Sequence, residues 1–489
     1  MTTKLPEPVA IENVSSFSDD VDVLVVGFGV AGGCAAVEAA AAGARVLVLE
    51  RAAVAGGTSA LAGGHFYLGG GTSVQRATGH VDSTQAMYEY LMAVSLDPQP
   101  DMIGAYCEGA VEHCDWLESL GFEFERSYYP DKAVIQPGTE GLMYTGNEKV
   151  WPFRDLTRPA PRGHKVPVPG ETGGGSLVVD LLVERAITLG VEIRYETSAT
   201  ALIVEGRRIA GATWKRDGKT AAIRAGAVVL AAGGFVMNSE MLAKHVPRLA
   251  GKTFALGTTY DDGLGIRLGH SVGGALKHMD QGFITAPVYP PAQMLTGVIV
   301  NSDGQRFVAE DSYHARTSAF ALEQPGAVAY LIVDSKVMDS SERPLLAPLI
   351  DGFEDVSTME SSLGIAPQRL QATLERYNHH AACGQDPDFH KAPEFIAPQT
   401  RRPWAVFDLR VGKAMYSGFT LGGLSTSPRG QVLGEDGTPI SGLHAAGACA
   451  STIAQDAKGY SSGTQLGAAS FFGRCAGRQA AALAKTVAA

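Results

Sequence analysis

A glycine-rich turn between two apolar runs is the first feature of this sequence that predicts a chemical role. Val21 to Val26 is apolar except at Asp22, and Gly27-Phe28-Gly29-Val30-Ala31-Gly32 follows it directly. An alanine-rich stretch continues to about Ala42, and a second expected strand, Arg45 to Leu49, is apolar after its first residue and ends at Glu50. Glycines at this spacing between a strand and a helix let the backbone approach a pyrophosphate, which the helix N-terminus stabilises. The pattern predicts a dinucleotide site in which Glu50 binds a ribose hydroxyl.

Two further glycine-rich regions indicate which dinucleotide is bound. Gly56-Gly57-Thr58-Ser59 follows the second strand and offers another phosphate-contacting loop, which nicotinamide-binding domains lack. Near the C-terminus, Gly442 to Gly447 resembles the strand and turn that flavoproteins place beside the ribityl chain. Ser462 to Leu466 then opens a helix whose N–H groups can hold the flavin O2. The combination predicts FAD rather than NAD.

An α/β scaffold is needed to bring these turns around one ligand. Beyond the first βαβ unit we expect helical regions over about 83–120, 173–189 and 464–487, hairpin turns at 205–206 and 217–218, and a buried strand over 227–232. From about residue 281, glycine pairs become rarer and Pro, Ser and charged residues more frequent. We therefore expect an FAD-binding domain formed by residues 1–280 and 406–489, with residues 281–405 inserted as a capping and catalytic domain.

Composition excludes several classes of function. The 489 residues are enough for two or three domains, and the net charge of −11 without a basic tract argues against nucleic acid as a partner. No apolar run reaches about 18 residues, and residues 1–20 lack a signal-peptide core, so we expect a cytoplasmic protein without a transmembrane segment. No metal site is expected, because no two of the six cysteines form a C-x-x-C pair; they are Cys34, Cys107, Cys114, Cys383, Cys449 and Cys475.

Nearly the whole chain resembles the fumarate reductase and succinate dehydrogenase flavoproteins. The matching stretches are VVGFGVAGGCAAVEAAAAGARVLVLE, GGTSALAGG, GGGSLVVDLL, VVLAAGGF, NSDGQRFVAED, LGGL, GLHAAGA and SGTQLGAASFFGRCAG. The resemblance implies an FAD-binding two-dinucleotide-binding-domain (Rossmann-like) fold with an inserted α+β capping domain that closes over the flavin. It also implies that FAD is bound by Gly27, Gly29, Val30, Ala31, Gly32, Glu50, Arg51, Gly56, Gly57, Thr58, Ser59, Gly63, Gly64, Ala232, Gly233, Asp262, Gly447, Gly463, Gln465 and Leu466.

Departures from the family pattern indicate a different substrate. Covalent members carry a histidine where this chain has Gly57, so the FAD is expected to be non-covalent. Dicarboxylate reductases carry an arginine where this chain has His314, a histidine just before the motif that begins at Leu421, and an arginine where this chain has Tyr460. The groups that clamp two carboxylates are therefore replaced, which argues against fumarate.

Hydroxyl groups stand in the place of those cations. Tyr313, Tyr460 and Ser462 lie on what the resemblance implies is the substrate side of the flavin, and their pattern most resembles the 3-ketosteroid Δ4-(5α)-dehydrogenases. By that resemblance, Tyr460 donates to the C3 carbonyl, Ser462 removes the C4 proton, and Tyr313 passes this proton on. The expected substrate is an apolar 3-ketosteroid, and the electron acceptor is not identified.

Several alternatives stay open at this stage. His314 is a rival base, and Ser462 is equally a helix cap. Arg162 and His164 are candidates for structural ties. Two roles are open for a group of aromatic side chains, which could line a steroid pocket or only pack the loop that carries them: Tyr128, Tyr129, Tyr144, Trp151 and Phe153. Alternative functions are Δ1-ketosteroid dehydrogenation, enoate reduction, and flavin-based redox sensing without turnover.

Overall fold

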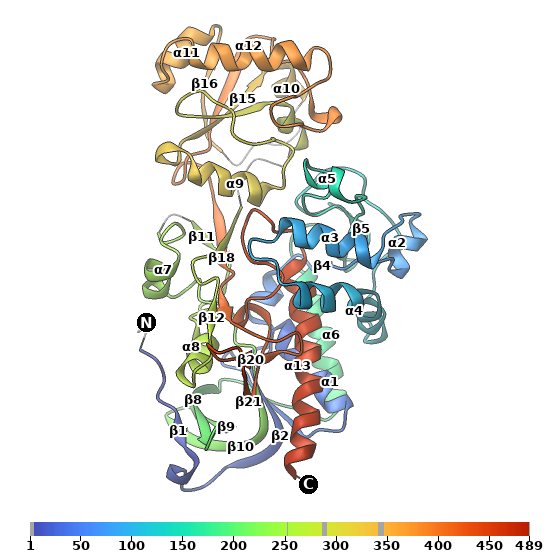
Figure 1. The fold of residues 1–489 in the computed structure, drawn as a ribbon, viewed down its shortest axis with the longest axis vertical. Coiled ribbons are helices and arrows are strands. Elements are labelled where there is room, and N and C mark those ends of the chain that lie inside the picture. Colours follow the sequence, from blue (N-terminus) through green and yellow to red (C-terminus); the bar gives the residue numbers. More distant parts are fainter. Residues whose placement is uncertain (1–3, 252, 286–290, 341–346, 489) are drawn as a thin grey trace.

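A large mixed sheet forms the base of the molecule in the computed structural model, which describes residues 4–251, 253–285, 291–340 and 347–488 (Figure 1). The strand order is β1-β8-β9-β21-β10-β2-β3-β7, and β20 pairs with β21. The bounds are β1 Val9–Ala10, β2 Asp19–Val26, β3 Val46–Leu49, β7 Glu192–Arg194, β8 Ser198–Glu205, β9 Arg208–Arg216, β10 Lys219–Leu230, β20 Gln431–Leu433 and β21 Pro439–Ala445. The neighbours from β21 through β10, β2 and β3 to β7 are parallel, whereas β8, β9 and β10 form the two expected hairpins.

Both faces of β2 are buried from Val23 onwards, which explains the apolar run from Val23 to Val26. Val23 and Val25 belong to the core on the helix-covered face of the sheet. Leu24 and Val26 belong to a second core, which lies on the opposite face together with residues of β8 and β9. Because strands that are buried on both faces read as continuous apolar runs, the first βαβ unit could be recognised from sequence.

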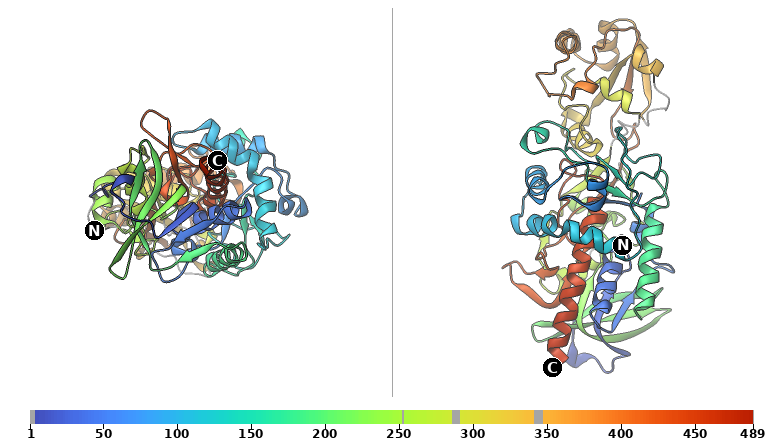
Figure 2. Two further views of the ribbon diagram at one scale, coloured as in Figure 1. Left: turned by 90° about the horizontal axis from the view of Figure 1, so that it is seen from below. Right: turned by 90° about the vertical axis from the view of Figure 1, so that its right-hand side faces the viewer.

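Three helices, α1 (Val30–Ala41), α6 (Gly174–Thr188) and α13 (Thr464–Ala488), cover one face of the sheet (Figures 1 and 2). α1 and α13 cross so closely that a Cβ on Gly473 of α13 would collide with the backbone of Ala31 in α1. The C-terminal helix therefore packs back on the first βαβ unit, as the sequence predicted. This crossing fixes the start of α13 next to the glycine-rich turn.

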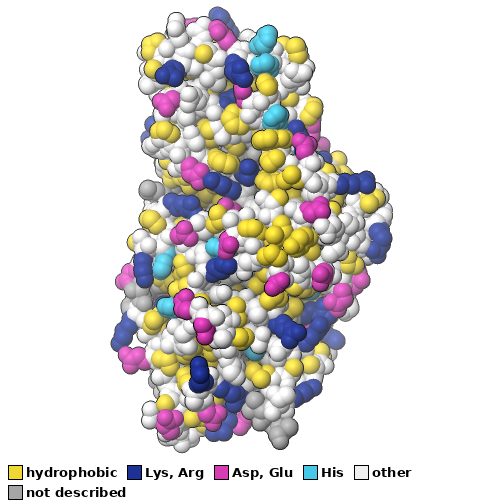
Figure 3. Space-filling view, viewed as in Figure 1, with side chains coloured by type: hydrophobic (Ala, Val, Ile, Leu, Met, Phe, Trp, Pro, Cys, Tyr) yellow, Lys and Arg dark blue, Asp and Glu magenta, His cyan; other side chains and the backbone are white. Residues whose placement is uncertain are grey.

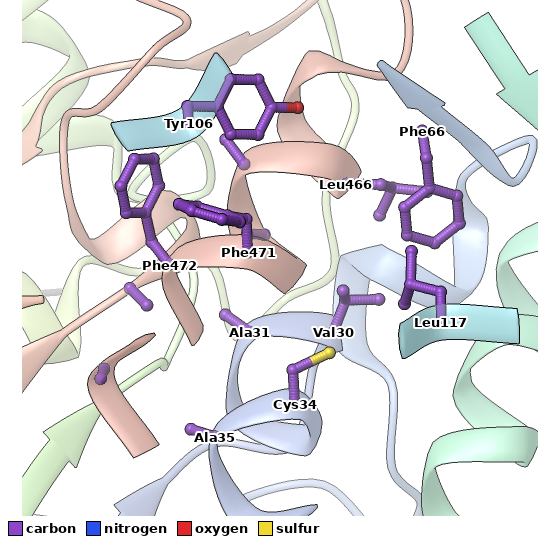
Figure 4. Packing of buried hydrophobic residues seen from close by; sticks show 14 of the residues in the cluster. Val30, Ala31, Cys34, Ala35, Phe66, Tyr106, Leu117, Leu466, Phe471 and Phe472 are labelled. Carbon is purple, nitrogen blue, oxygen red and sulfur yellow. The ribbon is translucent and has the colours of Figure 1, made fainter. Parts of the chain in front are cut away.

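A side layer packs against α13. It comprises α2 (Ser73–Ala77), α3 (Thr84–Val94), α4 (Pro100–Ser119), α5 (Phe153–Leu156) and a small antiparallel sheet of β4 (His65–Tyr67), β6 (Gly163–Lys165) and β5 (Leu142–Met143). Figure 4 shows rings of this layer against α13, where Tyr106 stacks on Phe472 with centroids 6.1 Å apart. The helical region expected over 83–120 is two helices, because Pro98 interrupts it and Pro100 starts α4.

A second α+β unit stands at the far end of the molecule (Figures 1 and 2). Its antiparallel sheet has the order β14-β15-β17-β16. Its elements are β14 Val298–Asn301, α9 His314–Glu323, β15 Ala329–Asp334, α10 Ser335–Ser340, β16 Leu349–Phe353, α11 Val356–Leu363, α12 Arg369–Ala381 and β17 Trp404–Asp408. We call this unit the cap. The domain boundaries at 280 and 405 stay a prediction, and residues 286–290 and 341–346 of the expected insert lie outside the described residues.

Neighbouring strands carry the chain into and out of the cap. β13 (Gly282–Thr285) pairs antiparallel with β18 (Ser417–Thr420), and β11 (Phe254–Ala255) pairs with the other edge of β18. A further short pair joins β12 (Leu276–Lys277) and β19 (Gly423–Leu424), and α8 (Leu264–Ser271) packs against β19. The helix α7 (Ser239–His245) precedes β11 in the chain. The paired strands β13 and β18 therefore bring the cap next to the start of α13.

Acidic and basic side chains are interspersed on the face that Figure 3 shows, so the net charge of −11 is distributed rather than concentrated there. Within the described residues, no helix is both long enough and apolar enough to cross a membrane. The histidines include five that are buried, and burial lowers the pKa of each to about 3 or about 4; they are His65, His113, His164, His314 and His444.

Replacement of His113 by Gln should make the melting temperature less sensitive to acid. The folded state keeps His113 neutral down to a pKa of about 3, whereas an unfolded histidine takes up a proton below about pH 6.5. The unfolded wild type therefore binds more protons as the pH falls from about 6.5 to about 4, which lowers its stability by up to roughly 1.4 kcal/mol per pH unit. A glutamine side chain takes up no proton in this pH range, so the variant does not have this loss of stability.

The measurement is the Tm difference between His113→Gln and wild type, followed from neutral pH downwards. The difference should become steadily more favourable to the variant. The exposed His379 offers a control, because His379→Gln should give a Tm difference without that trend. A His113→Gln difference that does not change with pH would contradict the prediction.

Candidate active site

The glycine-rich turn and Glu50 form the floor of a deep cavity at the carboxyl ends of β2 and β3. Gly27 has a φ of +97°, and the Phe28 N–H that follows donates to Glu50 Oε2 at 2.8 Å. The other carboxylate oxygen accepts from Ala52 N at 2.7 Å. A Cβ on Gly32 would collide with the carbonyl oxygen of Gly27, so this glycine allows helix and strand to pack closely.

The second loop contacts both the turn and a distant acid. Ser59 Oγ accepts from Val30 N at 3.1 Å, at the start of α1, so this hydroxyl caps the helix. The hydroxyl of Thr58 donates to the carboxylate of Asp261, and burial raises the pKa of Asp261. Asp261 lies on the cavity wall, whereas the neighbouring Asp262 does not line the cavity. Oδ2 of Asp262 forms an ion pair with Nη1 of Arg51 at 2.8 Å.

Most of the residues expected to bind FAD line this one cavity. They are Gly27, Gly29, Val30, Ala31, Glu50, Arg51, Gly56, Gly57, Thr58, Ser59, Gly63, Ala232, Gly233, Gly447, Gly463, Gln465 and Leu466. Gly32, Gly64 and Asp262 do not reach its wall. Gly64 instead packs against Val166, which a Cβ at this position would strike. The cavity also includes Thr197, Ser198 and Ala199 at the start of β8, which the sequence had not singled out.

At the other end of the cavity, the three expected catalytic residues lie together. The hydroxyls of Tyr313 and Ser462 are 2.7 Å apart, and the Tyr460 ring stacks near Tyr313 with centroids 6.3 Å apart. Tyr313 and Tyr460 are almost fully buried. Burial raises the pKa of Tyr460 above its usual value, although the backbone N–H of Gln465 works in the opposite direction. Tyr460 is therefore a protonated hydrogen-bond donor at neutral pH.

His314 also lines the cavity, directly after Tyr313. Its Nδ1 is 2.7 Å from the hydroxyl of Thr285. Burial, assisted by the nearby charge of Lys132, lowers the pKa of His314 to about 3. The imidazole is therefore neutral at neutral pH and does not supply the positive charge that an arginine supplies at this position of a carboxylate clamp.

An aromatic wall faces these hydroxyls. Phe283 of β13 and Phe419 of β18 stack with centroids 4.6 Å apart, and Phe283 also lies 4.6 Å from Tyr460. Val134 and Ile135 line the cavity as well. Sequence reasoning missed these residues, because only the pairing of β13 with β18 brings the two phenylalanines together.

The aromatic residues considered as an alternative pocket wall lie elsewhere. None of Tyr128, Tyr129, Tyr144, Trp151 and Phe153 lines the cavity within the described residues. Tyr128 packs edge-on against Tyr144, and Phe153 packs edge-on against Tyr90. Tyr128, Tyr144 and Phe153 therefore pack the loop rather than line the cavity.

Arg162 and His164 are structural ties. Arg162 is fully buried, and its guanidinium donates to both oxygens of Asp82, at 2.8 and 3.0 Å. His164 contacts the hydroxyl of Thr72 at 2.7 Å. Neither residue lines the cavity.

A buried network of ions supports the segment that presents Tyr313. Arg306 donates to both oxygens of Glu310 and of Asp386, and Lys391 Nζ lies 3.0 Å from Glu310. Burial alone would raise the pKa of Glu310, but Arg306 and Lys391 hold it below its usual value. The glutamate of the Arg306–Glu310 motif is thus a structural residue.

The donor set of the cavity fits a flavin dinucleotide. The turn at Gly27 and the start of α1 provide backbone N–H groups for a pyrophosphate. Glu50 and Asp261 provide carboxylates that accept from hydroxyls, and the aromatic end is suited to a flat ring system. A Cβ on Gly57 would meet nothing within 4 Å, so the backbone there is open to close approach of the ligand, whereas Gly56 packs against Ala60 and Val179.

Comparison with known proteins agrees with this assignment. A family described as FAD binding domain matches residues 22–469. A 3-ketosteroid-Δ4-(5α)-dehydrogenase from Rhodococcus jostii RHA1, solved with 4-androstene-3,17-dione, is 40% identical, with a TM-score of 0.92 over 97% of this chain and 99% of that chain. Urocanate reductase from Eggerthella lenta is 30% identical over 95% of this chain and 75% of its own length.

A 3-oxo-5-alpha-steroid 4-dehydrogenase from Comamonas testosteroni is 27% identical over 88% of this chain and 93% of its own length. The match to the family and the geometry of the dinucleotide site lead to the same assignment. This chain belongs to the FAD-binding flavoprotein family that includes fumarate reductases and ketosteroid dehydrogenases, and it is an FAD-dependent oxidoreductase.

Proposed function

We propose that this protein dehydrogenates a 3-ketosteroid and introduces the C4–C5 double bond. The observation that carries the proposal is the pair of hydroxyls from Tyr313 and Ser462, 2.7 Å apart, beside the protonated hydroxyl of Tyr460. An apolar wall of Phe283 and Phe419 faces this group and suits a rigid, flat, apolar substrate. The similarity to the two steroid dehydrogenases supports the same substrate class.

The FAD is held without a covalent bond in this proposal. Gly57 stands where covalent members of the family carry a histidine, and a glycine has no side chain that can form the bond. The turn from Gly27 to Ala31 holds the pyrophosphate, and Glu50 binds the ribose. Residues Gly463 to Leu466, at the start of α13, contact the ring system.

Replacement of Glu50 by Ala should reduce FAD occupancy while the fold persists. The carboxylate accepts two backbone N–H groups of the cofactor-binding turns, so its loss loosens the turns and removes a ribose acceptor. A charged hydrogen bond contributes about 1.5–3 kcal/mol, which corresponds to roughly ten- to a hundred-fold in affinity. The exposed Glu435→Ala provides a matched control with normal occupancy.

Acid precipitation measures both properties in one experiment. Wild type should release its yellow colour into the supernatant, and Glu50→Ala should release less per mole of protein while its circular dichroism spectrum is unchanged. Colour that stays in the wild-type pellet would contradict the non-covalent assignment. Full occupancy in Glu50→Ala would contradict the role of this carboxylate.

The reaction divides into tasks that the three residues can perform. Ser462 accepts the C4 proton while its own proton passes along the hydrogen bond to Tyr313, and Tyr313 releases its own hydroxyl proton on towards solvent. The electrons of the C4–H bond form the C4–C5 double bond as hydride leaves C5, and FAD, when bound, supplies the hydride acceptor. Tyr460 donates to the C3 oxygen, where negative charge develops in the transition state.

Tyr460 is well placed for this oxyanion role. Its buried hydroxyl lines the cavity, stays protonated at neutral pH and can donate to a ligand oxygen. Ser462 is a weak base by itself, and the hydrogen bond to Tyr313 provides the path by which Ser462 gives up its own proton. His314, neutral and bonded to Thr285, lies beside this pair.

An anaerobic titration tests the proposed function. A 5α-3-ketosteroid should bleach the flavin absorbance at a ratio of about one per site, because it carries the C4–C5 single bond that is oxidised. A 4-ene-3-ketosteroid that bleaches the flavin would indicate Δ1-dehydrogenation instead. Fumarate should not restore the colour of the reduced protein. Absence of bleaching by every ketosteroid would overturn the proposal.

Removal of single hydroxyls should separate the three roles. Tyr460→Phe should lose on the order of 10²–10³ in turnover, as expected for one oxyanion donor. Tyr313→Phe and Ser462→Ala should each be severely impaired, and the double variant should be little worse than either, because residues of one relay are not additive. The buried Tyr416→Phe, away from the cavity, is the matched control.

Flavin spectra should stay near wild type in all of these variants. The relay assignment fails if Ser462→Ala keeps near-full turnover of a 5α-3-ketosteroid. His314 would then be the leading base, and Ser462 would act only at the start of the helix.

A further inference from the structure

A short strap, residues 145–147, lies against both segments that carry the hydroxyl pair. The backbone N–H of Ser462 donates to the carbonyl oxygen of Thr145 at 2.8 Å. Asn147 Oδ1 accepts the backbone N–H of Tyr313 at 2.9 Å. Asn147 Nδ2 donates to the carbonyl oxygen of Lys458 at 3.3 Å, in the loop that leads to Tyr460. One side chain thus joins the cap to the loop before α13.

The strap is itself rigidly held. Asn147 is fully buried, and its backbone N–H donates to the hydroxyl of Tyr90 at 2.8 Å. That hydroxyl lies 3.3 Å from Ser461 Oγ. A Cβ on Gly146 would collide with the side chain of Ser461, so the backbone of the strap lies directly against the residue before Ser462. Because Asn147 and its partners Tyr90 and Tyr313 are buried, the amide of Asn147 has little freedom to reorient.

We propose that Asn147 is a positioning residue that sets the distance between the hydroxyls of Tyr313 and Ser462. This inference rests on the proposed function, because the distance matters only if the two hydroxyls form a proton relay. The site requires one acceptor and one donor on a single planar group, which an amide provides and a carboxylate does not. Asn147 also makes formation of the relay conditional on the cap being in place, since Tyr313 belongs to the cap.

Asn147→Asp gives a test with a characteristic pH dependence. The ionised carboxylate still accepts the Tyr313 N–H but repels the Lys458 carbonyl oxygen. The protonated carboxyl can accept with one oxygen and donate with the other, which restores both contacts. Burial raises the pKa of a carboxyl above its usual value of about 3.9, by up to about 3–5 units, and the positive charge of Arg316, which donates to the same Lys458 carbonyl at 3.5 Å, opposes this rise in part. The ratio of variant to wild-type kcat should therefore rise as the pH is lowered from about 8 towards about 5.5.

Asn147→Ala provides the complementary measurement. It should lose on the order of 10²-fold in kcat for a 5α-3-ketosteroid, as expected for a small misplacement of reacting groups. KM should change little, and the ratio to wild type should not recover at low pH. Asn378→Asp is the matched control, because Asn378 also accepts a backbone N–H and donates to a backbone carbonyl, both of Gln399, far from the cavity. Its kcat ratio should be independent of pH.

Three outcomes would overturn the proposal: an Asn147→Asp variant with wild-type kcat at all pH values, the same low-pH recovery in Asn378→Asp, or an Asn147→Ala variant that retains full kcat. Flavin content confirms that each variant folds. If Asn147→Asp does not bind flavin, Asn147→Ala decides the matter.

A crystal structure of the Asn147→Ala holoenzyme separates this inference from the proposed function. The separation between Tyr313 Oη and Ser462 Oγ should increase from 2.7 Å to beyond hydrogen-bonding distance. A separation that stays at 2.7 Å would overturn the positioning role, whatever the substrate. If wild type turns over no ketosteroid while this separation does increase, the proposed function fails and the structural role of Asn147 stands.

Discussion

The hydrogen bond between Tyr313 and Ser462 is the constraint around which the rest of the fold is organised. The two residues are 149 positions apart, and they come from different units of the structure. Tyr313 is the residue before α9 in the cap, and Ser462 lies just before α13. The crossing of α13 with α1 fixes one partner relative to the dinucleotide turn, and the pairing of β13 with β18 brings the other. The contact therefore exists only when both units are assembled.

The buried ions behind Tyr313 are best understood in the same terms. Four charged groups, those of Arg306, Glu310, Asp386 and Lys391, lie together and almost without exposure. Such a network adds little net stability over apolar packing, because desolvation offsets the attraction between the charges. Removal of one member, however, leaves a buried charge unpaired and costs about 3–5 kcal/mol. We interpret the network as a device that specifies one geometry for the segment leading into Tyr313.

Local spacing allowed the dinucleotide site to be predicted, because its strand, turn and helix are contiguous in sequence. Residues such as Gly32 and Glu50 have roles that follow from that order alone. The choice between Asp261 and Asp262 could not be made in this way. The two are adjacent and chemically identical, and only the turn before α8 directs the first into the cavity and the second towards Arg51.

The substrate end of the cavity was less accessible to sequence reasoning for the same physical reason. Its aromatic wall depends on strand pairing between Phe283 and Phe419, which are far apart in the chain. The aromatic residues around Tyr144 are dense in the sequence but do not line the cavity, and Tyr144 packs edge-on against Tyr128. The hydroxyl residues were located only through resemblance to a family, since no local periodicity marks Tyr313 or Ser462.

The electrostatics of the cavity then favour a neutral substrate over an anionic one. Among the described residues that line it, Arg51 alone carries an arginine or lysine side chain, and it belongs to the dinucleotide end. His314 is neutral, so a carboxylate that entered beside Tyr460 would lose its hydration without gaining a cation. A ketone loses little hydration there. In the proposed reaction, negative charge appears on the ketone oxygen only as the C4 proton leaves, at the moment when the donor hydroxyl of Tyr460 is most strongly attracted to it. Under this proposal the site binds the transition state more strongly than the ground state, which is the condition for catalysis.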